Sequence, residues 1–256
     1  MIVINCEQGS PEWHCARAGV ITASMFGVAR KRVGVLDERQ ALYVQARQSG
    51  MPEKEAMALA GYKVAPRSDI ITRALRGEQV GDWSEEAKNY AFRLAVERLN
   101  GEPLDEGFET YAMRRGHELE PMARAEHEMQ SGLIVQRAGF VKTDDGLFGA
   151  SADGLIGDDE GAEYKCFIAP DRLRTFHIDN DASELFEQVQ GCMWITGRQR
   201  WHVGLYCPAL VHCNRHLWWK VFERDDAFIE AMERDLRAFA EMVGAFQVQL
   251  EQPMAA

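Results

Sequence analysis

The sequence predicts an α/β fold: a single domain over residues 1–256 with a mixed central β-sheet flanked by helices, and a small helical insertion at 35–80. Two features support this prediction. Segments with apolar residues every three or four positions, typical of amphipathic helices, are interspersed with short runs near glycines that are typical of strands. The chain has 256 residues and a hydrophobic content of 46%, so it is long enough to bury a full core.

The clearest helix is expected at 84–100, where apolar residues recur at helical spacing before a Gly-Glu-Pro break: Ala87, Tyr90, Ala91, Leu94, Ala95 and Leu99. A second helix at 110–131 leads into a strand at 135–142. The next elements are expected to form a β-hairpin, with strands at 149–156 and 162–167. The remaining elements are expected as a mobile crossing loop at 171–178, a helix at 183–196, two paired strands at 198–206 and 216–223, and a helix at 225–243.

The predicted hairpin carries two acids and a lysine: Asp153, Glu163 and Lys165. Side chains two positions apart on a strand share a face, so Glu163 and Lys165 point the same way and Tyr164 points the other way. Pairing across the hairpin then brings Asp153 near them. Two converging carboxylates repel each other and need a cation, and oxygen ligands suit Mg²⁺ or Mn²⁺. The lysine adds positive charge where a nucleophilic water or a developing phosphoryl charge would sit.

On spacing alone, an exposed Glu-Lys ladder on a polar hairpin is the commoner explanation. The surrounding sequence favours a catalytic site. GASADG followed by EYKC resembles the D…(D/E)xK core of the restriction-endonuclease-like nucleases. Within them it is similar to the phage lambda exonuclease branch, the YqaJ-like viral recombinases. That pattern usually has proline before the aspartate and often after the Lys-Cys pair. This chain has Ala152 and Phe167 there, which changes no chemical group.

Residues 10–24, SPEWHCARAGVITAS, predict a short helix, a glycine break and a second helix capped by Thr22 or Ser24. The pattern W-x-x-x-R-x-G-x-x-T-A-S resembles the same family, in which its arginine and serine hold a DNA phosphate. The resemblance therefore implies a 5′-phosphate site of Arg17, Ser24 and Ser151. A forked, permanent charge and helix N-terminal amides suit an anion, but an ordinary exposed arginine and a helix cap explain these residues equally well.

Two further segments match the family pattern. Gly116 to Glu120 matches G-x-x-x-E, whose glutamate stands beside the metal site in relatives. QVQGCMW, which begins at Gln188, matches Q-V-Q-x-x-M-W, whose first glutamine reaches the active site. The resemblance thus adds Glu120 and Gln188 as assisting catalytic residues. Without it, both are ordinary surface residues of helices.

The resemblance implies an activity: 5′→3′ digestion of one strand of linear double-stranded DNA from an end, leaving a 3′ single-stranded overhang for phage-type recombination. Mg²⁺, with Mn²⁺ as a substitute, would be held by Asp153, Glu163 and the backbone carbonyl of Tyr164. Lys165 would activate or position the attacking water. Relatives act as rings of three subunits and work with a protein that anneals single strands, so a homotrimer and such a partner are expected.

Composition limits the alternatives. The net charge of −11 excludes a broad basic DNA coat and favours a confined DNA path. No signal peptide or membrane-length apolar run is recognised, so a cytoplasmic protein of a bacterial host, without membrane contact, is expected. Six scattered cysteines without a CxxC pair are typical of reduced, buried thiols, and a zinc site at Cys207, His212, Cys213 and His216 is a minor alternative.

The segment from Val28 to Val80 carries ten basic and six acidic residues, a net +4, which leaves −15 for the rest of the chain. Three short helices are expected in it, and the phrase EAMALAGY resembles a helix-turn-helix of phage small-terminase-like proteins. The segment is therefore a candidate DNA-contacting insertion. A helical hairpin that only packs on the core explains the same pattern.

Two other functions stay open. One is another restriction-endonuclease-like enzyme, a DNA endonuclease or repair nuclease; the version with an iron-sulfur cluster needs four clustered cysteines, which are missing. The other is a DNA-binding regulator whose nuclease core has decayed, against which the intact Asp153, Glu163 and Lys165 argue.

Overall fold

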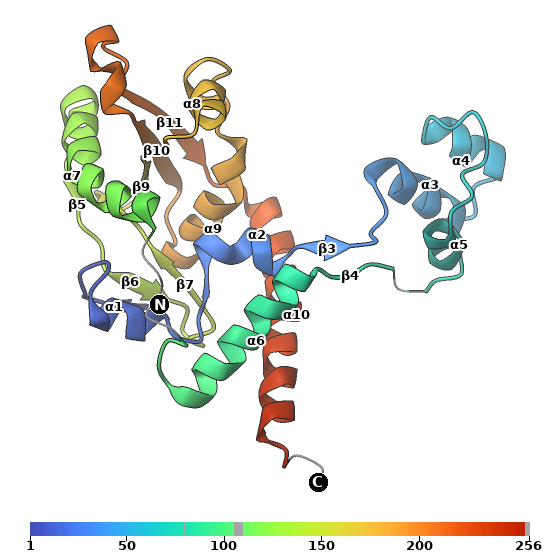
Figure 1. Cartoon of the computed structure of the whole chain (residues 1–256). Coiled ribbons are helices and arrows are strands. Elements are labelled where there is room, and N and C mark those ends of the chain that lie inside the picture. Colours follow the sequence, from blue (N-terminus) through green and yellow to red (C-terminus); the bar gives the residue numbers. More distant parts are fainter. Residues whose placement is uncertain (79, 105–109, 254–256) are drawn as a thin grey trace. The chain divides into compact units, whose positions relative to one another are not determined.

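The structure, a computed structural model, describes residues 1–78, 80–104 and 110–253. The chain divides into two compact units (Figure 1). The core unit comprises Met1–Ala29 and Tyr90–Ala256, and the inserted unit comprises Arg30–Asn89.

The first sheet of the core unit has four strands in the order β1-β6-β7-β2. Its outer strand β2 pairs with β7 in parallel, whereas β6 pairs antiparallel with both β1 and β7. Side chains of β7 are almost fully buried, as expected for a strand with neighbours on both sides. The strands are β1 (Ile2–Ile4), β2 (Ile21–Thr22), β6 (Phe140–Lys142) and β7 (Phe148–Ser151).

The second sheet has five strands in the order β11-β10-β9-β8-β5. Strands β9 and β10 pair in parallel and the other pairs are antiparallel, so both sheets are mixed, as the sequence predicts for its α/β fold. Trp201 of β10 is fully buried. The strands are β5 (Val135–Gln136), β8 (Gly154–Ile156), β9 (Glu160–Lys165), β10 (Arg200–Tyr206) and β11 (Leu217–Glu223).

The expected continuous strand at 149–156 is wrong. The chain leaves the first sheet after Ser151 and enters the second at Gly154, so Asp153 lies between two strands. The break has a local cause: the Asp153 N–H donates to Ala162 O at 3.1 Å, and its own carboxylate accepts the N–H of Tyr164. Asp153 thereby extends the β8–β9 ladder by one backbone hydrogen bond, and its side chain takes the next N–H of β9.

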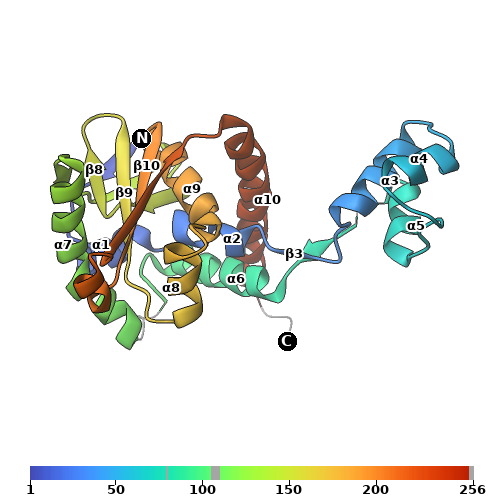
Figure 2. The same ribbon diagram turned by 90° about the horizontal axis from the view of Figure 1, so that it is seen from above.

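Helices cover both faces of the second sheet. Figure 2 shows α7 (Tyr111–Ser131) on one side of β9 and β10 and α9 (Phe186–Thr196) on the other. Alternation along β9 therefore sends successive side chains to different helices. The mobile loop expected at 171–178 is wrong, because the segment forms the helix α8 (Pro170–His177), which starts with proline at its first turn and buries Phe176.

Two long helices of the core unit, α6 and α10, pack on each other. Tyr90 of α6 stacks on Phe239 of α10, with ring centroids 5.6 Å apart. None of the described helices is long and apolar enough to cross a membrane. The remaining elements are α1 (Pro11–Arg17), η1 (Ala23–Met25), α2 (Phe26–Ala29), α6 (Glu85–Asn100), η2 (Ser183–Leu185), η3 (Pro208–Cys213) and α10 (Asp226–Glu251).

The inserted unit has a hydrophobic core of its own. It contains a two-stranded antiparallel ribbon of β3 (Arg32–Val33) and β4 (Asp82–Trp83). Between these strands lie three helices: α3 (Glu38–Gln48), α4 (Glu53–Leu59) and α5 (Asp69–Leu75). The core consists of Tyr43, Val44, Ala46, Ala56, Ala60, Ile71 and Ala74.

Candidate active site

The structure brings Asp153, Glu163 and Lys165 together. The β8–β9 register pairs Gly154 with Ala162, so the residue before β8 lies next to Glu163. Asp153 Oδ2 accepts a hydrogen bond of 2.6 Å from Tyr164 N. The Lys165 ammonium donates to Glu163 Oε1 at 2.6 Å, which places both side chains on one face of β9.

Tyr164 points to the opposite face, as strand alternation predicts. Its hydroxyl lies 2.8 Å from Nδ1 of His127, a buried residue of α7. A second buried histidine extends this network: His127 Nε2 lies 3.1 Å from His202 Nδ1. The tyrosine side chain therefore anchors β9 to α7 and leaves only its backbone beside the two carboxylates.

The site carries an excess of negative charge. Burial raises the pKa of Asp153 well above its ordinary value, and the neighbouring carboxylates of Glu163 and Glu120 raise it further. Burial alone would lower the pKa of Lys165, but the attraction of Glu163 and Asp153 outweighs it and the pKa is raised. The lysine is therefore a fixed positive charge that balances only part of the acidic cluster.

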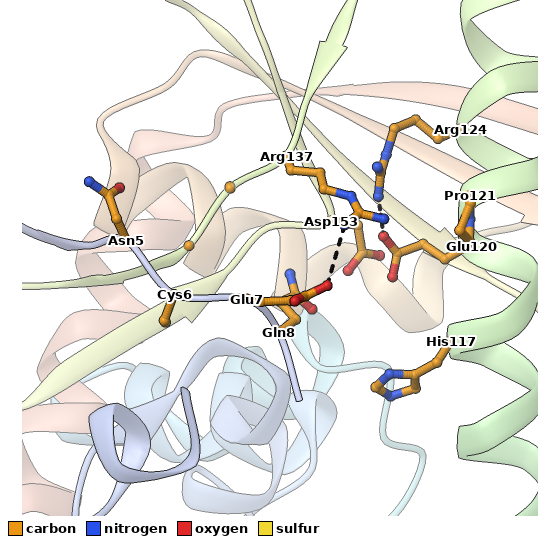
Figure 3. Close-up of a pocket in the computed structure, with 12 residues that line it drawn as sticks. Asn5, Cys6, Glu7, Gln8, His117, Glu120, Pro121, Arg124, Arg137 and Asp153 are labelled. Carbon is orange, nitrogen blue, oxygen red and sulfur yellow. Dashed lines mark hydrogen bonds and ion pairs between the residues drawn. The ribbon is translucent and has the colours of Figure 1, made fainter. Parts of the chain in front are cut away.

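Glu120 comes to this site from α7. It lines two cavities together with Asp153, one of about 610 Å³ and one of about 470 Å³. Figure 3 shows the two carboxylates facing the same space, with Arg124 bound to Glu120 from one helical turn further along α7. His117, on the preceding turn, lines both cavities as well.

Gln188 approaches from α9. Its Nε2 donates to Glu163 Oε1 at 2.8 Å, the same oxygen that accepts the hydrogen bond from Lys165. The amide therefore fixes the rotamer of Glu163 from the helix side. Residues 183–196 were expected to be helical with Gln188 facing the site, and the structure places the side chain there.

The donor set fits a hard divalent cation. Glu163 Oε2 is buried without a hydrogen-bond partner, which is costly for a carboxylate oxygen unless a cation takes its lone pairs. Within 1–78, 80–104 and 110–253, no three His, Cys, Asp or Glu side chains gather closely enough to hold an ion by themselves. Two carboxylates with a backbone carbonyl and water suit Mg²⁺, which binds few protein groups and keeps several waters.

Arg17 contacts Ser151 directly and shares a cavity with Ser24. Arg17 Nη1 donates to Ser151 Oγ at 3.2 Å, and both Arg17 and Ser24 border a cavity of about 360 Å³. Burial lowers the pKa of the Arg17 guanidinium, as expected for a cation that is largely desolvated. Glu97 also borders the cavity, but it is bound to Arg93 at 2.8 Å, so its charge is offset.

Sequence reasoning missed three side chains that hold the expected ones. Trp13 donates its indole N–H to Ser151 Oγ at 2.9 Å and lies 4.1 Å under the Arg17 guanidinium. Arg124 binds Glu120. The Trp13–Arg17 and Glu120–Arg124 contacts follow from spacing, because positions four apart share a helix face. Gln8, whose Nε2 binds Ala152 O at 2.7 Å, had no signal in the sequence, since its partner is 144 residues away.

The chain is similar to several solved nuclease structures. A crystal structure of an alkaline exonuclease (LHK-Exo) from Laribacter hongkongensis is 27% identical, with a TM-score of 0.66 over 94% of this chain and 96% of that chain. The structure of LHK-Exo in complex with dAMP gives the same values. A phage related exonuclease from Haemophilus somnus 129PT shares the fold, with 16% identity and a TM-score of 0.55 over 73% and 91% of the two chains. No curated protein matches the chain.

Fold and site together define the class of the phage-type exonucleases, nucleases built on the restriction-endonuclease-like fold. Within that class the family model of the YqaJ-like viral recombinase domain matches residues 71–199. The chain belongs to that family. The matched range includes Glu120, Asp153, Glu163, Lys165 and Gln188.

Proposed function

We propose that the protein is a Mg²⁺-dependent exonuclease that degrades one strand of linear double-stranded DNA from its 5′ end and leaves a 3′ single-stranded overhang for recombination. The observation that carries the proposal is the pair of neighbouring carboxylates of Asp153 and Glu163, with Lys165 bound to Glu163 Oε1 and with Glu163 Oε2 buried without a hydrogen-bond partner. Family membership supports the nuclease class, and Mn²⁺ is expected to substitute for Mg²⁺.

In this proposal, Asp153, Glu163 and the backbone carbonyl of Tyr164 bind the metal. Bound there, Mg²⁺ would polarise the scissile phosphate and lower the pKa of a bound water. Lys165 keeps its proton, because its pKa is raised, and holds positive charge beside the attacked phosphate. Its role is therefore to orient the water and to stabilise developing charge.

The assisting residues act through position. Gln188 holds Glu163 in place through its 2.8 Å hydrogen bond. Glu120, braced by Arg124, borders the cavities on the open side of the site and adds a carboxylate oxygen for metal-bound water. Both are expected to reduce cleavage when truncated, with little effect on folding.

The experiment that tests the chemistry compares linear duplex with covalently closed circular duplex of the same sequence. Mg²⁺-dependent release of nucleotides is expected from the linear form only. Asp153→Ala and Glu163→Ala should abolish nucleotide release, while the affinity for DNA stays within a few-fold of wild type. Both residues bind the metal and neither binds the phosphate backbone of the DNA. Full activity in either variant contradicts the site assignment, and efficient cutting of the closed circle favours an endonuclease instead.

The polarity of digestion is proposed to come from a pocket for the 5′ phosphate formed by Arg17, Ser24 and Ser151. A half-buried guanidinium bound to the Ser151 hydroxyl, with Ser24 on the same cavity, suits a terminal phosphate. Duplex with 5′ phosphates should therefore be digested much faster than 5′-hydroxyl duplex, and Arg17→Ala should remove the preference. Equal wild-type rates on both substrates refute the pocket.

We also propose, from the family alone, that the protein assembles as a homotrimer and cooperates with a protein that anneals single-stranded DNA. Sedimentation equilibrium of the purified chain tests the assembly, with a mass three times that of the 28.9 kDa chain expected. A monomer at micromolar concentration contradicts it.

A further inference from the structure

The inserted unit takes no part in the proposed chemistry, yet its basic residues are unevenly placed. We propose that the face formed by Lys63, Arg67, Thr72, Arg73 and Arg76, here called the α5 face, binds the phosphate backbone of duplex DNA away from the ends. The choice of duplex DNA as the ligand rests on the proposed function, but the inference concerns binding along the duplex and not cleavage at its ends.

Helix α5 is built to present these residues. Ser68 caps its start, with its hydroxyl accepting from Ile71 N. Ile71 and Ala74 point inward and are buried in the core of the inserted unit. At helical spacing the positions between them point outward, and Thr72 and Arg73 are exposed.

The helix is held firmly by its neighbours in the unit. Gln48 of α3 donates to Ala74 O at 2.8 Å, so α3 and α5 are tied by a hydrogen bond as well as by apolar packing. Arg39 of α3 donates to Ala60 O at 2.8 Å and stacks 3.9 Å from the Tyr62 ring, which fixes the start of the α4–α5 connection. A surface presented by a fixed scaffold loses little conformational entropy on binding.

Charge is separated within the unit. Residues 63–78 contain four basic and two acidic residues, whereas 37–59 contain three basic and four acidic residues. Two of the three basic residues in 37–59 are arginines that donate hydrogen bonds to backbone carbonyls of the unit. Arg39 donates to Ala60 O, and Arg47 donates to Met51 O at 2.6 Å. Within the helical part of the unit, residues 37–78, the positive charge available to an external anion is therefore concentrated on the α5 side.

The side chains of the α5 face are accessible. Arg76 is 70% exposed and its guanidinium lies 4.0 Å from Glu78 Oε1. Arg73 binds Glu78 at 3.0 Å, but both side chains are about half exposed, and ion pairs of that kind contribute little and exchange readily for another anion. Thr72 adds a hydroxyl next to the arginines, a common donor to phosphate oxygens.

Duplex DNA is the partner that this surface fits. The chain outside residues 28–80 carries −15 and repels a polyanion at long range, so a local positive surface is needed to hold DNA that is not yet in the active site. Phosphate contacts of this kind are independent of sequence and allow a protein to slide along a duplex. Such contacts suit an enzyme that must find an end.

The test uses the full-length protein, a chelator in place of divalent metal, and a duplex whose two ends are closed by hairpin loops. Binding is measured against salt concentration for the wild type and for the triple variant Lys63→Ala, Arg67→Ala, Arg76→Ala. Each phosphate contact contributes about 0.9 to the slope of log affinity against log salt. The variant should therefore lose roughly two to three units of slope and bind at least tenfold more weakly at about 0.1 M salt.

A matched control removes three exposed positive charges outside the α5 face: Lys54→Ala, Lys220→Ala and Arg234→Ala. It changes the net charge equally and should keep the wild-type slope. Equal losses in both variants, or an unchanged slope in the α5 variant, overturn the proposal. So does a change in the sedimenting mass of the α5 variant, which would make this face a subunit contact.

Two additions keep the result decisive. If the triple variant does not fold, Arg76→Glu alone, at a 70% exposed position, should lower the slope by at least one unit. Digestion of open-ended duplex at saturating concentration should stay at the wild-type rate in the α5 variant. Failure of the end-processing proposal leaves the closed-duplex result intact, so the two ideas are tested separately.

Discussion

Asp153→Asn is predicted to stabilise the metal-free protein while abolishing cleavage. The asparagine has the shape of the aspartate, and its Oδ1 can still accept the Tyr164 N–H. The substitution removes a negative charge next to Glu163 and Glu120. Burial is the largest cause of the raised pKa of Asp153, and these two carboxylates raise it further. Removing that charge relieves repulsion that the fold carries whenever no cation is bound.

The magnitude follows from the pKa. A carboxyl whose pKa is raised on folding costs nothing below its ordinary pKa of about 3.9, and the cost grows as the pH rises through the raised pKa. Each unit of increase corresponds to about 1.4 kcal/mol, or about 3–6 °C in Tm for a domain of this size. The gain from Asp153→Asn should therefore be present at pH 8 and vanish near pH 4.

Thermal unfolding at the two pH values, with and without Mg²⁺, measures the effect. Asp145→Asn is the matched control, since burial would raise the pKa of Asp145 but hydrogen bonds from Thr143 and Leu147 N and the contact with Arg237 lower it overall. The same substitution should destabilise there. A lower Tm for metal-free Asp153→Asn at pH 8, or an undiminished rise in Tm with Mg²⁺, refutes the reasoning.

Three further variants test neighbouring parts of the account. Gln188→Ala removes a hydrogen bond to a charged group, worth about 1.5–3 kcal/mol, and should slow cleavage by about 10- to 100-fold in single-turnover assays with unchanged DNA affinity. Lys165→Ala should lose turnover while the Mg²⁺ concentration for half-maximal activity stays within a few-fold, and a large rise in that concentration alone would assign the lysine to metal binding. Gly161→Ala places a Cβ 2.3 Å from the Trp201 ring and should lower the free energy of unfolding by about 1–3 kcal/mol in urea titrations. Its control, Gly244→Ala in α10, meets no atom within 4 Å and should be neutral or stabilising.

Much of the fold was predictable because its periodicities are local. The helices at 84–100, 110–131 and 183–196 were placed within about two residues of α6, α7 and η2–α9. The last helix was placed too short, since α10 continues to Glu251. The error at Asp153 has a different origin. Only two residues separate the end of β7 from the start of β8, so both strands follow one alternation pattern, and only the tertiary hydrogen bonds of the acid distinguish them.

The residues of the site that belong to short sequence motifs were predictable. Spacing placed Glu163 and Lys165 on one face, and the β9 geometry agrees. The local sequence around two distant residues does not determine whether they come into contact in the fold. The bond from Gln188 to Glu163 was therefore expected only from the family pattern, and the support that Gln8 gives to Ala152 was not expected at all.

The most direct test of the central claim is anomalous diffraction from a crystal grown or soaked with Mn²⁺. We expect a manganese peak within about 2.2 Å of one carboxylate oxygen of Asp153, Glu163 Oε2 and the Tyr164 carbonyl oxygen. The peak should be lost in Glu163→Ala crystals treated in the same way. A well-ordered site without a peak, or manganese bound only elsewhere, contradicts the claim that these two carboxylates hold the catalytic metal.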